Sequence, residues 1–256
     1  MTKQRLLELF EMHKGEYLSG QTIAEDLGIS RTAIWKQIHA LKEEGYDIES
    51  VKKKGYRLKF NSDILSHAKV KQFLTPDLSI DQVYLYKTID STNQAVYLES
   101  MKTDARWLIV ASEKQEKGQA KNQMTFDSPD GKGVYMSVMI RMKKPLDTLK
   151  TLLNYNSQAV QQAILKVSGV EGVVNEENNI LYNNRKLCGI MTEVIVEAES
   201  QTIRQMMVGI GIYVHEASKD HIALTEITGQ YCNRSELIAY IINELYAYYH
   251  QQKSCC

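Results

Sequence analysis

The feature that most constrains the fold is the stretch from residue 30 to residue 41, Ser-Arg-Thr-Ala-Ile-Trp-Lys-Gln-Ile-His-Ala-Leu. Ile34, Ile38 and Leu41 recur at helical spacing, so they define an apolar stripe that must be buried against other elements. Ser30 suits the N-cap, because its hydroxyl can accept a hydrogen bond from a free backbone N–H of the first turn. The stretch therefore predicts an amphipathic helix that begins after Ser30.

The opposite face of this predicted helix is polar and basic. It presents Arg31, Thr32, Lys36 and His39. Cations and short hydroxyls on an exposed helix can contact both the phosphates and the base edges of DNA. A charged helix face is more often a solvated surface, so the choice between the two interpretations depends on the neighbouring elements.

The residues before this helix complete a helix-turn-helix pattern. Apolar residues between positions 6 and 10 predict a first helix, and residues 22–27 predict a short second helix that opens at Ser19. Gly28 follows, and glycine adopts the positive φ of a tight turn at little cost. A helix, a glycine-containing turn and a further helix are the arrangement of DNA-binding helix-turn-helix proteins.

Two short segments after this pattern predict a β-hairpin, or wing. Residues 46–51 and 56–58 flank a tip of three lysines and a glycine. Lysines at a loop tip suit the phosphate backbone of DNA, where charge neutralisation dominates affinity, although a solvated charge run is the alternative. Beside a helix-turn-helix we prefer the DNA interpretation. The residues predicted to contact DNA are Ser30, Arg31, Thr32, Trp35, Lys36, His39, Lys52, Lys53, Lys54 and Arg57.

The composition is that of a soluble globular protein with room for two domains. The 256 residues are 43% hydrophobic and 24% charged, and the formal net charge of zero excludes a broad polyanion-binding field. We find no apolar run long enough for a membrane span and no signal peptide, so we expect no membrane partner. The four cysteines are Cys188, Cys232, Cys255 and Cys256, and they show no paired metal-ligand spacing, so we expect no metal site. Cysteine usage of this kind also leads us to expect a reduced, cytoplasmic location.

The pattern changes character after the wing. We expect a winged helix-turn-helix domain over residues 1–60, linker helices over residues 61–74, at 64–66 and 67–73, and a second domain over residues 75–256. Strands are predicted over residues 82–86, 107–111, 133–140, 172–174, 179–182, 186–194 and 205–212, and helices over residues 146–167 and 235–249. Strands in hairpins with separate helices indicate an α+β domain rather than a βαβ array.

Several motifs of the second domain occur together in one known family. They are Lys-Thr-Ile-Asp-Ser-Thr-Asn at residues 87–93, Gln115, Ser-Pro-Asp-Gly at 128–131, Tyr-Met-Ser at 135–137, Arg-Lys-Leu-Cys-Gly-Ile-Met-Thr-Glu at 185–193 and Val-Gly-Ile-Gly-Ile at 208–212. With the wing and the recognition helix, they make residues 1 to about 250 resemble the bacterial bifunctional biotin protein ligase/biotin operon repressors. The resemblance implies a mixed β-sheet flanked by helices, of the class II aminoacyl-tRNA synthetase-like type, behind a winged helix-turn-helix.

The resemblance also implies a ligand site and a reaction in two steps. In the family, biotin attacks ATP to form biotinyl-5'-adenylate, and a lysine of an acceptor protein then takes the biotinyl group. A carboxylate that attacks a phosphate needs cations and backbone N–H donors to offset the charge of the transition state. The ligand-binding residues that the resemblance carries over are Ser91, Thr92, Asn93, Gln115, Gly118, Lys121, Lys186, Gly189, Gly209 and Gly211.

The motifs that handle phosphate in the family are altered in this chain. The family's Gly-Arg-Gly-Arg-x-Gly-Arg loop corresponds to residues 118–124, where only Lys121 keeps a charge at an arginine position. The family's Lys-Trp-Pro-Asn-Asp corresponds to residues 175–179, where Asn175 replaces the lysine and two glutamates replace apolar residues that would lie near ATP. Each loss removes about 2–4 kcal/mol of transition-state stabilisation. We therefore assign no catalytic residue and regard Lys121 and Asn175 as degraded positions.

Aromatic replacements and the end of the chain depart from the family as well. Phe126 stands for a family tryptophan and Tyr213 for a small asparagine, and with Trp107 they are candidates for the pocket rim, against the commoner alternative of core positions. Longer family members continue into a small C-terminal β-barrel. We expect that barrel to be missing here, because the chain stops at Cys256 shortly after its last predicted helix.

These observations favour a DNA-binding transcriptional regulator, preferably a repressor, controlled by a small molecule in a catalytically impaired ligase-like domain. One alternative is an active biotin–[acetyl-CoA-carboxylase] ligase and biotin operon repressor, in which Lys114 or Lys117 reaches the phosphate. The other is a ligand-independent dimeric DNA-binding protein.

The expected partners follow from the favoured hypothesis. They are double-stranded DNA with a palindromic operator, a second copy of the chain joined through the sheet, and an effector that is biotin or a biotin/adenylate-like molecule. In the family, ligand binding orders a loop that corresponds to residues 114–125 and promotes the dimer, which requires the ligand to prefer the dimer-competent state. ATP, Mg and a biotin-acceptor protein are expected only for the active ligase.

Overall fold

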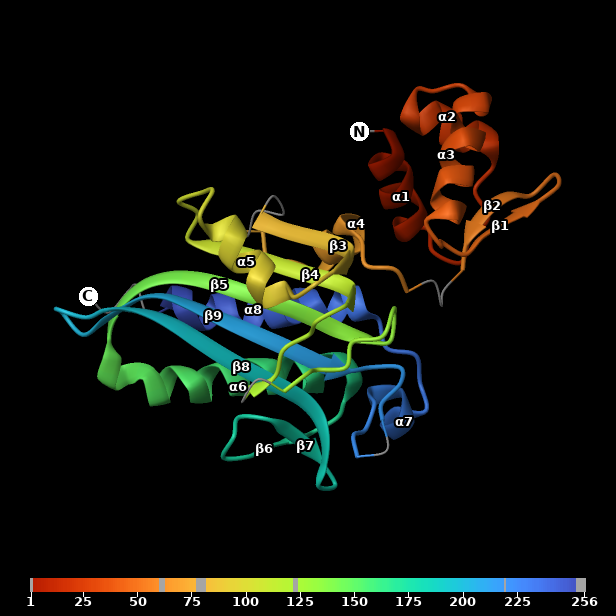
Figure 1. Cartoon of the computed structure of the whole chain (residues 1–256). Coiled ribbons are helices and arrows are strands. Elements are labelled where there is room, and N and C mark those ends of the chain that lie inside the picture. Colours follow the sequence, from red (N-terminus) through yellow and green to blue (C-terminus); the bar gives the residue numbers. More distant parts are fainter. Residues whose placement is uncertain (1, 60–62, 77–81, 122–123, 219, 252–256) are drawn as a thin grey trace. The chain divides into compact units, whose positions relative to one another are not determined.

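A computed structural model describes residues 2–59, 63–76, 82–121, 124–218 and 220–251 of the chain. The chain divides into two compact units, Met1–Gln72 and Phe73–Cys256, which are described separately below. Figure 1 labels the helices and strands of both.

The first unit is a three-helix domain with a two-stranded wing. Its elements are α1 (Thr2–Met12), α2 (Gly20–Leu27), α3 (Arg31–Glu43), β1 (Ile48–Val51), β2 (Gly55–Leu58) and α4 (His67–Phe73, whose last residue falls in the second unit). The predicted stripe of Ile34, Ile38 and Leu41 is buried in a core that also contains residues of α1, α2 and the wing. Gly28 ends α2 with a φ of 65°, so the predicted turn between α2 and α3 is confirmed.

The predicted helix at residues 64–66 is wrong, because residues 63–66 have no helical structure. The hydroxyl of Ser66 accepts a hydrogen bond of 3.2 Å from the backbone N–H of Lys69, so Ser66 caps α4 instead of continuing an earlier helix. α4 does not behave as a free linker. Ala68 joins the core of the first unit, and the fully buried Lys69 pairs with Glu11 of α1 at 3.3 Å.

The second unit is built on a seven-stranded mixed sheet in the order β3-β4-β5-β9-β8-β7-β6. The strands are β3 (Val83–Ile89), β4 (Trp107–Gln115), β5 (Gly133–Pro145), β6 (Val173–Val174), β7 (Ile180–Tyr182), β8 (Arg185–Glu197) and β9 (Thr202–Tyr213). Neighbouring strands run antiparallel except β3 and β4, which are parallel. The predicted strands are therefore present, and most extend beyond their predicted ends.

Helices cover both faces of this sheet (Figure 1). α5 (Thr92–Ser100) lies on one face, and α6 (Leu149–Ser168) and α8 (Arg234–Gln251) lie on the other. The second unit also contains the short 3₁₀ helix η3 (Leu146–Thr148) and the short helix α7 (Leu224–Thr228). Leu108 and Met207 pack with α5 in one cluster. Their neighbours Trp107 and Met206 point the other way, toward Tyr249 of α8. This alternation is what the period of two along a strand requires.

Sequence analysis did not predict α5. The helix starts directly after Ser91, and its first residues Thr92 and Asn93 are polar yet buried. A short helix that buries polar residues shows no continuous apolar stripe, so the periodicity that predicts helices is missing. The start of α5 lies beside β9, and this position brings polar side chains to one end of a pocket.

Candidate functional site

The first candidate site is the exposed face of α3 together with the wing. Ser30 caps α3, because its hydroxyl accepts a hydrogen bond of 3.2 Å from the backbone N–H of Ala33. The predicted DNA-contacting residues that are exposed are Ser30, Arg31, Thr32, Trp35, Lys36 and His39 on α3 and Lys52, Lys53 and Lys54 at the wing tip. Lys36, Lys52 and Lys53 have no ion-pair partner among the described residues, so their charges are available to a polyanion.

Arg57 differs from the other predicted cations. Its guanidinium donates to the carboxylate of Glu49, with 3.1 Å from Nε, and lies over the ring of Tyr17 at 4.5 Å. The side chain is about one-third exposed. The charge of Arg57 is therefore largely neutralised within the wing, which gives this residue a structural role that spacing in the sequence does not reveal.

The position of the wing depends on one glycine. Gly55 has a φ of 106°, and a Cβ at this position would lie 2.0 Å from the carbonyl oxygen of Leu18. The close approach allows two backbone hydrogen bonds between Leu18 and Tyr56, of 2.8 and 2.9 Å. A groove between the start of α3 and the wing is lined by Ser19, Gly20, Gln21, Arg31, Ser50, Val51, Lys52, Lys53, Gly55 and Tyr56.

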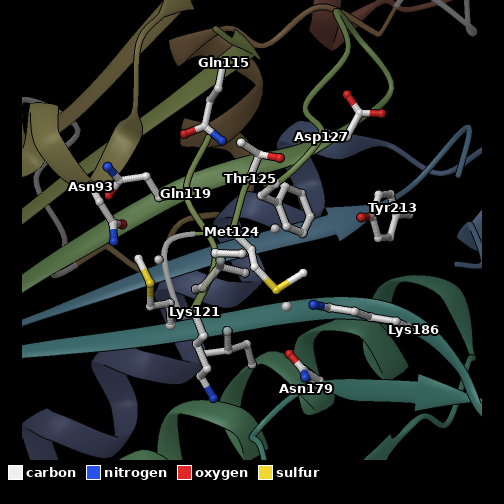
Figure 2. A pocket seen from close by; sticks show the side chains of 18 of the residues that line it. Asn93, Gln115, Gln119, Lys121, Met124, Thr125, Asp127, Asn179, Lys186 and Tyr213 are labelled. Atoms are coloured by element: carbon white, nitrogen blue, oxygen red, sulfur yellow. The ribbon is translucent and has the colours of Figure 1, made fainter. Parts of the chain in front are cut away.

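The second candidate site is a pocket of about 440 Å³ on the face of the sheet that carries α5. Its floor is formed by glycines of two strands, since Gly189 of β8 is the cross-strand partner of Gly211 of β9. Figure 2 shows Asn93 and Gln115 at one end of the pocket and Tyr213 at the other, with Met124 between them and Lys121 below, beside Asn179. A volume in the range of about 300–1,000 Å³ is usual for small-molecule sites.

A hydrogen-bond network holds the polar end of the pocket in place. Gln115 accepts from the backbone N–H of Thr92 at 2.8 Å and donates to the hydroxyl of Ser128 at 2.9 Å. The hydroxyl of Ser137 lies 2.8 Å from that of Thr92 and donates to the amide of Asn93, whose own N–H₂ reaches Glu193 at 3.1 Å. These side chains have little freedom, so the end is preorganised for a polar ligand group.

The two altered family motifs, at residues 118–124 and 175–179, contact each other at the pocket. Lys121 donates a hydrogen bond to the carbonyl oxygen of Glu177. Asn175 does not line the pocket. Its side-chain oxygen instead accepts from the backbone N–H groups of Glu177 and Asn179, at 3.1 and 2.9 Å, and so closes the turn over residues 175–179. Glu177 and Asn179 face the pocket.

Lys186 and His221 lie toward the aromatic end of the pocket. Burial lowers the pKa of Lys186, although Cys188 and Glu177 act in the opposite direction. Burial also lowers the pKa of His221, and the positive charge of Lys186 adds to this effect, so the imidazole is neutral near pH 7. The described cations at the pocket wall are therefore Lys121 and Lys186.

Two of the three aromatic candidates line the pocket. Phe126 and Tyr213 are lining residues, yet both are almost fully buried, so they belong to the core as well. Burial raises the pKa of Tyr213 to about 12, and its hydroxyl therefore stays protonated. Trp107 is a core residue, which was the commoner alternative, because its buried ring packs against Tyr246 and Tyr249 of α8 on the opposite face of the sheet.

Nine of the ten predicted ligand-binding residues line this pocket. Gly118 lies beside it, where a Cβ would meet the carbonyl oxygen of Phe126 at 2.4 Å, so this glycine serves loop packing. Lining residues that sequence analysis did not single out include Met124, Asp127, Ile190, Met191, Ser218 and His221. The alternation along β8 could have indicated Met191, which is two residues from Gly189 and so lies on the same face, whereas Ser218 and His221 follow from the tertiary fold alone.

The described part of the chain offers no group of His, Cys, Asp or Glu side chains suited to a metal ion. Among the same residues, none of the helices combines the length and the apolar character needed to cross a bilayer. Cys188 and Cys232 are buried thiols, and Cys255 and Cys256 lie outside the described residues.

Comparison with known proteins defines the class first. Residues 2–57 match an HTH domain, and residues 85–212 match the biotin/lipoate A/B protein ligase family. The fold agrees, with a TM-score of 0.56 to a biotin protein ligase from Aquifex aeolicus in complex with biotin and ATP (20% identity, covering 68% of this chain and 72% of that one). A biotin protein ligase from Leishmania major in complex with biotinyl-5-AMP gives 0.55 (17% identity, 66% and 75% covered). The chain thus joins a helix-turn-helix domain to a ligase-fold domain.

Curated relatives make the assignment more specific. The bifunctional ligase/repressor BirA from Bacillus subtilis is 31% identical over 94% of this chain and 76% of its own length. The protein of the same name from Escherichia coli is 31% identical over 91% of this chain and 72% of its own length. The chain therefore belongs to the family of the bifunctional ligase/repressor BirA.

Proposed function

We propose that this protein is a DNA-binding transcriptional regulator, a repressor, whose ligase-like domain binds a small-molecule effector without efficient catalysis. The helix-turn-helix match and the repressor activity in the relatives' names support the DNA-binding part. The exposed and unpaired lysines of the wing and of α3 provide the charge that phosphate contacts require.

One observation carries the proposal of impaired catalysis. Lys121 is the one basic residue of segment 118–124, and its ammonium is bound to the carbonyl oxygen of Glu177. The other two lysines considered as substitutes are paired away from the pocket, Lys114 with Glu116 at 2.8 Å and Lys117 with Asp90 at 2.7 Å. The attack of a carboxylate on a nucleoside triphosphate brings together several negative charges, which this arrangement does not offset.

The effector we propose is biotin or a molecule of similar size and polarity. Solved ligases of this fold are described as complexes with biotin and with biotinyl-5-AMP. The preorganised end of the pocket, with Gln115, Thr92 and Asn93, offers both donors and acceptors to a ligand of this kind.

The active ligase remains the second candidate, and the presence of Lys121 and Lys186 in the pocket wall favours it. Incubation of the purified chain with biotin, Mg-ATP and a biotin-acceptor domain separates the two proposals. We expect no transfer of biotin above a reaction without enzyme, while an active family ligase labels the acceptor in the same buffer. Transfer at a rate comparable with that ligase would refute impaired catalysis.

We further propose that two copies of the chain associate through the edge of β8. β7 pairs with β8 only as far as Cys188, and from Gly189 to Glu197 the described pairs of β8 are with β9 alone. An unpaired strand edge accepts a second strand readily. Sedimentation of the full chain measures the outcome, and a chain that stays monomeric would refute this proposal.

A further inference from the structure

The ring of Phe126 occupies the space that the floor glycines leave open. A Cβ on Gly211 would lie 2.4 Å from Cζ of Phe126, and a Cβ on Gly189 would lie 3.3 Å from Cε2. The ring therefore rests directly on the backbone of both β8 and β9. Glycines in facing strands permit such close approach of a bound group, and here the group belongs to the protein itself.

Phe126 is the first member of an aromatic stack that closes one end of the pocket. Its ring centroid lies 5.2 Å from that of Tyr213, with an interplanar angle of 20°. Tyr213 in turn lies 4.7 Å from the ring of His221, at 33°. Aromatic pairs at these separations attract each other beyond their burial, so the stack resists displacement by a ligand.

Backbone hydrogen bonds hold Phe126 in the stack. The N–H of Phe126 donates to the carbonyl oxygen of Gly118 at 2.9 Å, and the N–H of Ala120 donates to Met124 at 2.7 Å. Gln119 and Thr125 form a β-bridge between the same two segments. The loop is thus fastened on both sides of its turn, and a ligand that needs the space of Phe126 must break these bonds.

The charges around the stack do not suit a phosphate. Lys121 and Lys186 are balanced by Asp127 and Glu177 among the described lining residues. Asp127 is exposed at the rim of the pocket, and its negative charge acts on both Tyr213 and His221. A single carboxylate can pair with Lys186, whereas the further charge of a phosphate finds neutral rings in the stack and a lining with no surplus of cations.

We propose that the stack of Phe126, Tyr213 and His221 determines ligand specificity. The pocket accepts a compact, unactivated carboxylic acid and excludes the adenylate of the same acid. This inference rests on the proposed sensing function and narrows it to a class of effector. In this proposal a ligase fold senses the acid itself, because the rings of the stack fill the space that the nucleotide part of an adenylate would need.

Calorimetry with two probes tests the inference on the full chain. The probes are biotin and a non-hydrolysable analogue of biotinyl-5'-adenylate. We expect the wild type to bind biotin at least about tenfold more tightly than the analogue, and we expect Tyr213→Asn to shift the affinity ratio at least about tenfold toward the analogue. Phe126→Ala is expected to shift the ratio in the same direction. Tyr231→Asn, the same substitution at an exposed ring outside the pocket, is expected to leave both affinities unchanged.

The outcomes distinguish this inference from the proposed function. Tighter binding of the analogue than of biotin by the wild type overturns the specificity role and leaves small-molecule sensing intact. An unchanged ratio in Tyr213→Asn also overturns it. If the wild type binds neither probe, the proposed sensing of biotin is wrong, and the inference about specificity is wrong with it. If Phe126→Ala fails to fold, as its thermal unfolding reports, the Tyr213→Asn arm decides.

Discussion

Replacing Lys52 and Lys53 by alanine should weaken DNA binding in a way that depends strongly on salt. Both side chains are exposed at the wing tip and have no ion-pair partner among the described residues. Each lysine that neutralises a phosphate contributes about 0.9 to the slope of log K against log salt concentration. The double variant should therefore lose about 1.8 from this slope for each bound chain.

The consequence is largest at low salt. A fourfold rise in salt, from about 50 to about 200 mM, weakens the wild type about tenfold more than the double variant, because four raised to the power 1.8 is about 12. Fluorescence anisotropy with a labelled duplex, selected from a random pool by the wild-type protein, measures the slope. Thermal unfolding of the variant confirms that the wing is intact, since exposed lysines contribute little to stability.

Arg57→Ala is the matched control for this experiment. Its guanidinium is already paired with Glu49, 3.1 Å from Nε to the carboxylate, so a phosphate contact would require this ion pair to break. We expect Arg57→Ala to change the slope by less than about 0.5. An unchanged slope in the double lysine variant would refute the assignment of the wing as a phosphate contact. A larger change of the salt slope in Arg57→Ala than in the double lysine variant would refute the argument that Glu49 neutralises Arg57.

Three further predictions concern stability. Gly55→Ala should destabilise the first unit by at least about 1–3 kcal/mol in urea unfolding, because its φ of 106° and its contact with Leu18 exclude a Cβ. Arg234→Met should cost about 3–5 kcal/mol, because it leaves the carboxylate of Glu113, 2.7 Å from the buried guanidinium, without its charge partner. His221→Gln should reduce the fall in the free energy of unfolding between about pH 8 and about pH 5. The reason is that burial lowers the pKa of His221 below its ordinary 6.5, so the unfolded chain binds a proton that the folded chain does not.

Controls for these variants come from the same structure. Gly169→Ala also has a positive φ, of 71°, but no atom lies within 4 Å of the added Cβ, so it should cost less than Gly55→Ala. Recovery of stability in Arg234→Met/Glu113→Leu would show that the loss comes from the orphaned charge. The native stability that depends on a neutral His221 is complete above about pH 6.5 and is lost as the pH falls through that value. Identical profiles for wild type and His221→Gln would contradict the effect of burial.

The winged helix was predictable because its signals are local. The spacing of Ile34, Ile38 and Leu41, the cap at Ser30 and the turn at Gly28 each act within a few residues, and the structure confirms all of them. Strands of the second unit were predictable for the same reason, since runs of apolar residues bounded by turns are local signals, although β4 and β5 are buried on both faces and show no alternation of burial. Their order in the sheet comes from pairing between distant segments.

The details of the pocket depended on contacts between residues far apart in sequence. Sequence comparison with the family identified Lys121 and Asn175 as altered positions, but only the fold shows that one binds the carbonyl oxygen of Glu177 and the other closes a turn. The same holds for Phe126, whose ring lies on Gly211.

The sequence by itself therefore determined the class of the protein: a helix-turn-helix domain followed by a ligase-like domain with altered phosphate motifs. Periodicity, caps and motif spacing are properties of short segments and can be found without coordinates. The tertiary structure decided which charges are neutralised and which space is filled, as at Arg57 and Phe126. Such outcomes depend on where distant backbones bring side chains together, which no local pattern encodes.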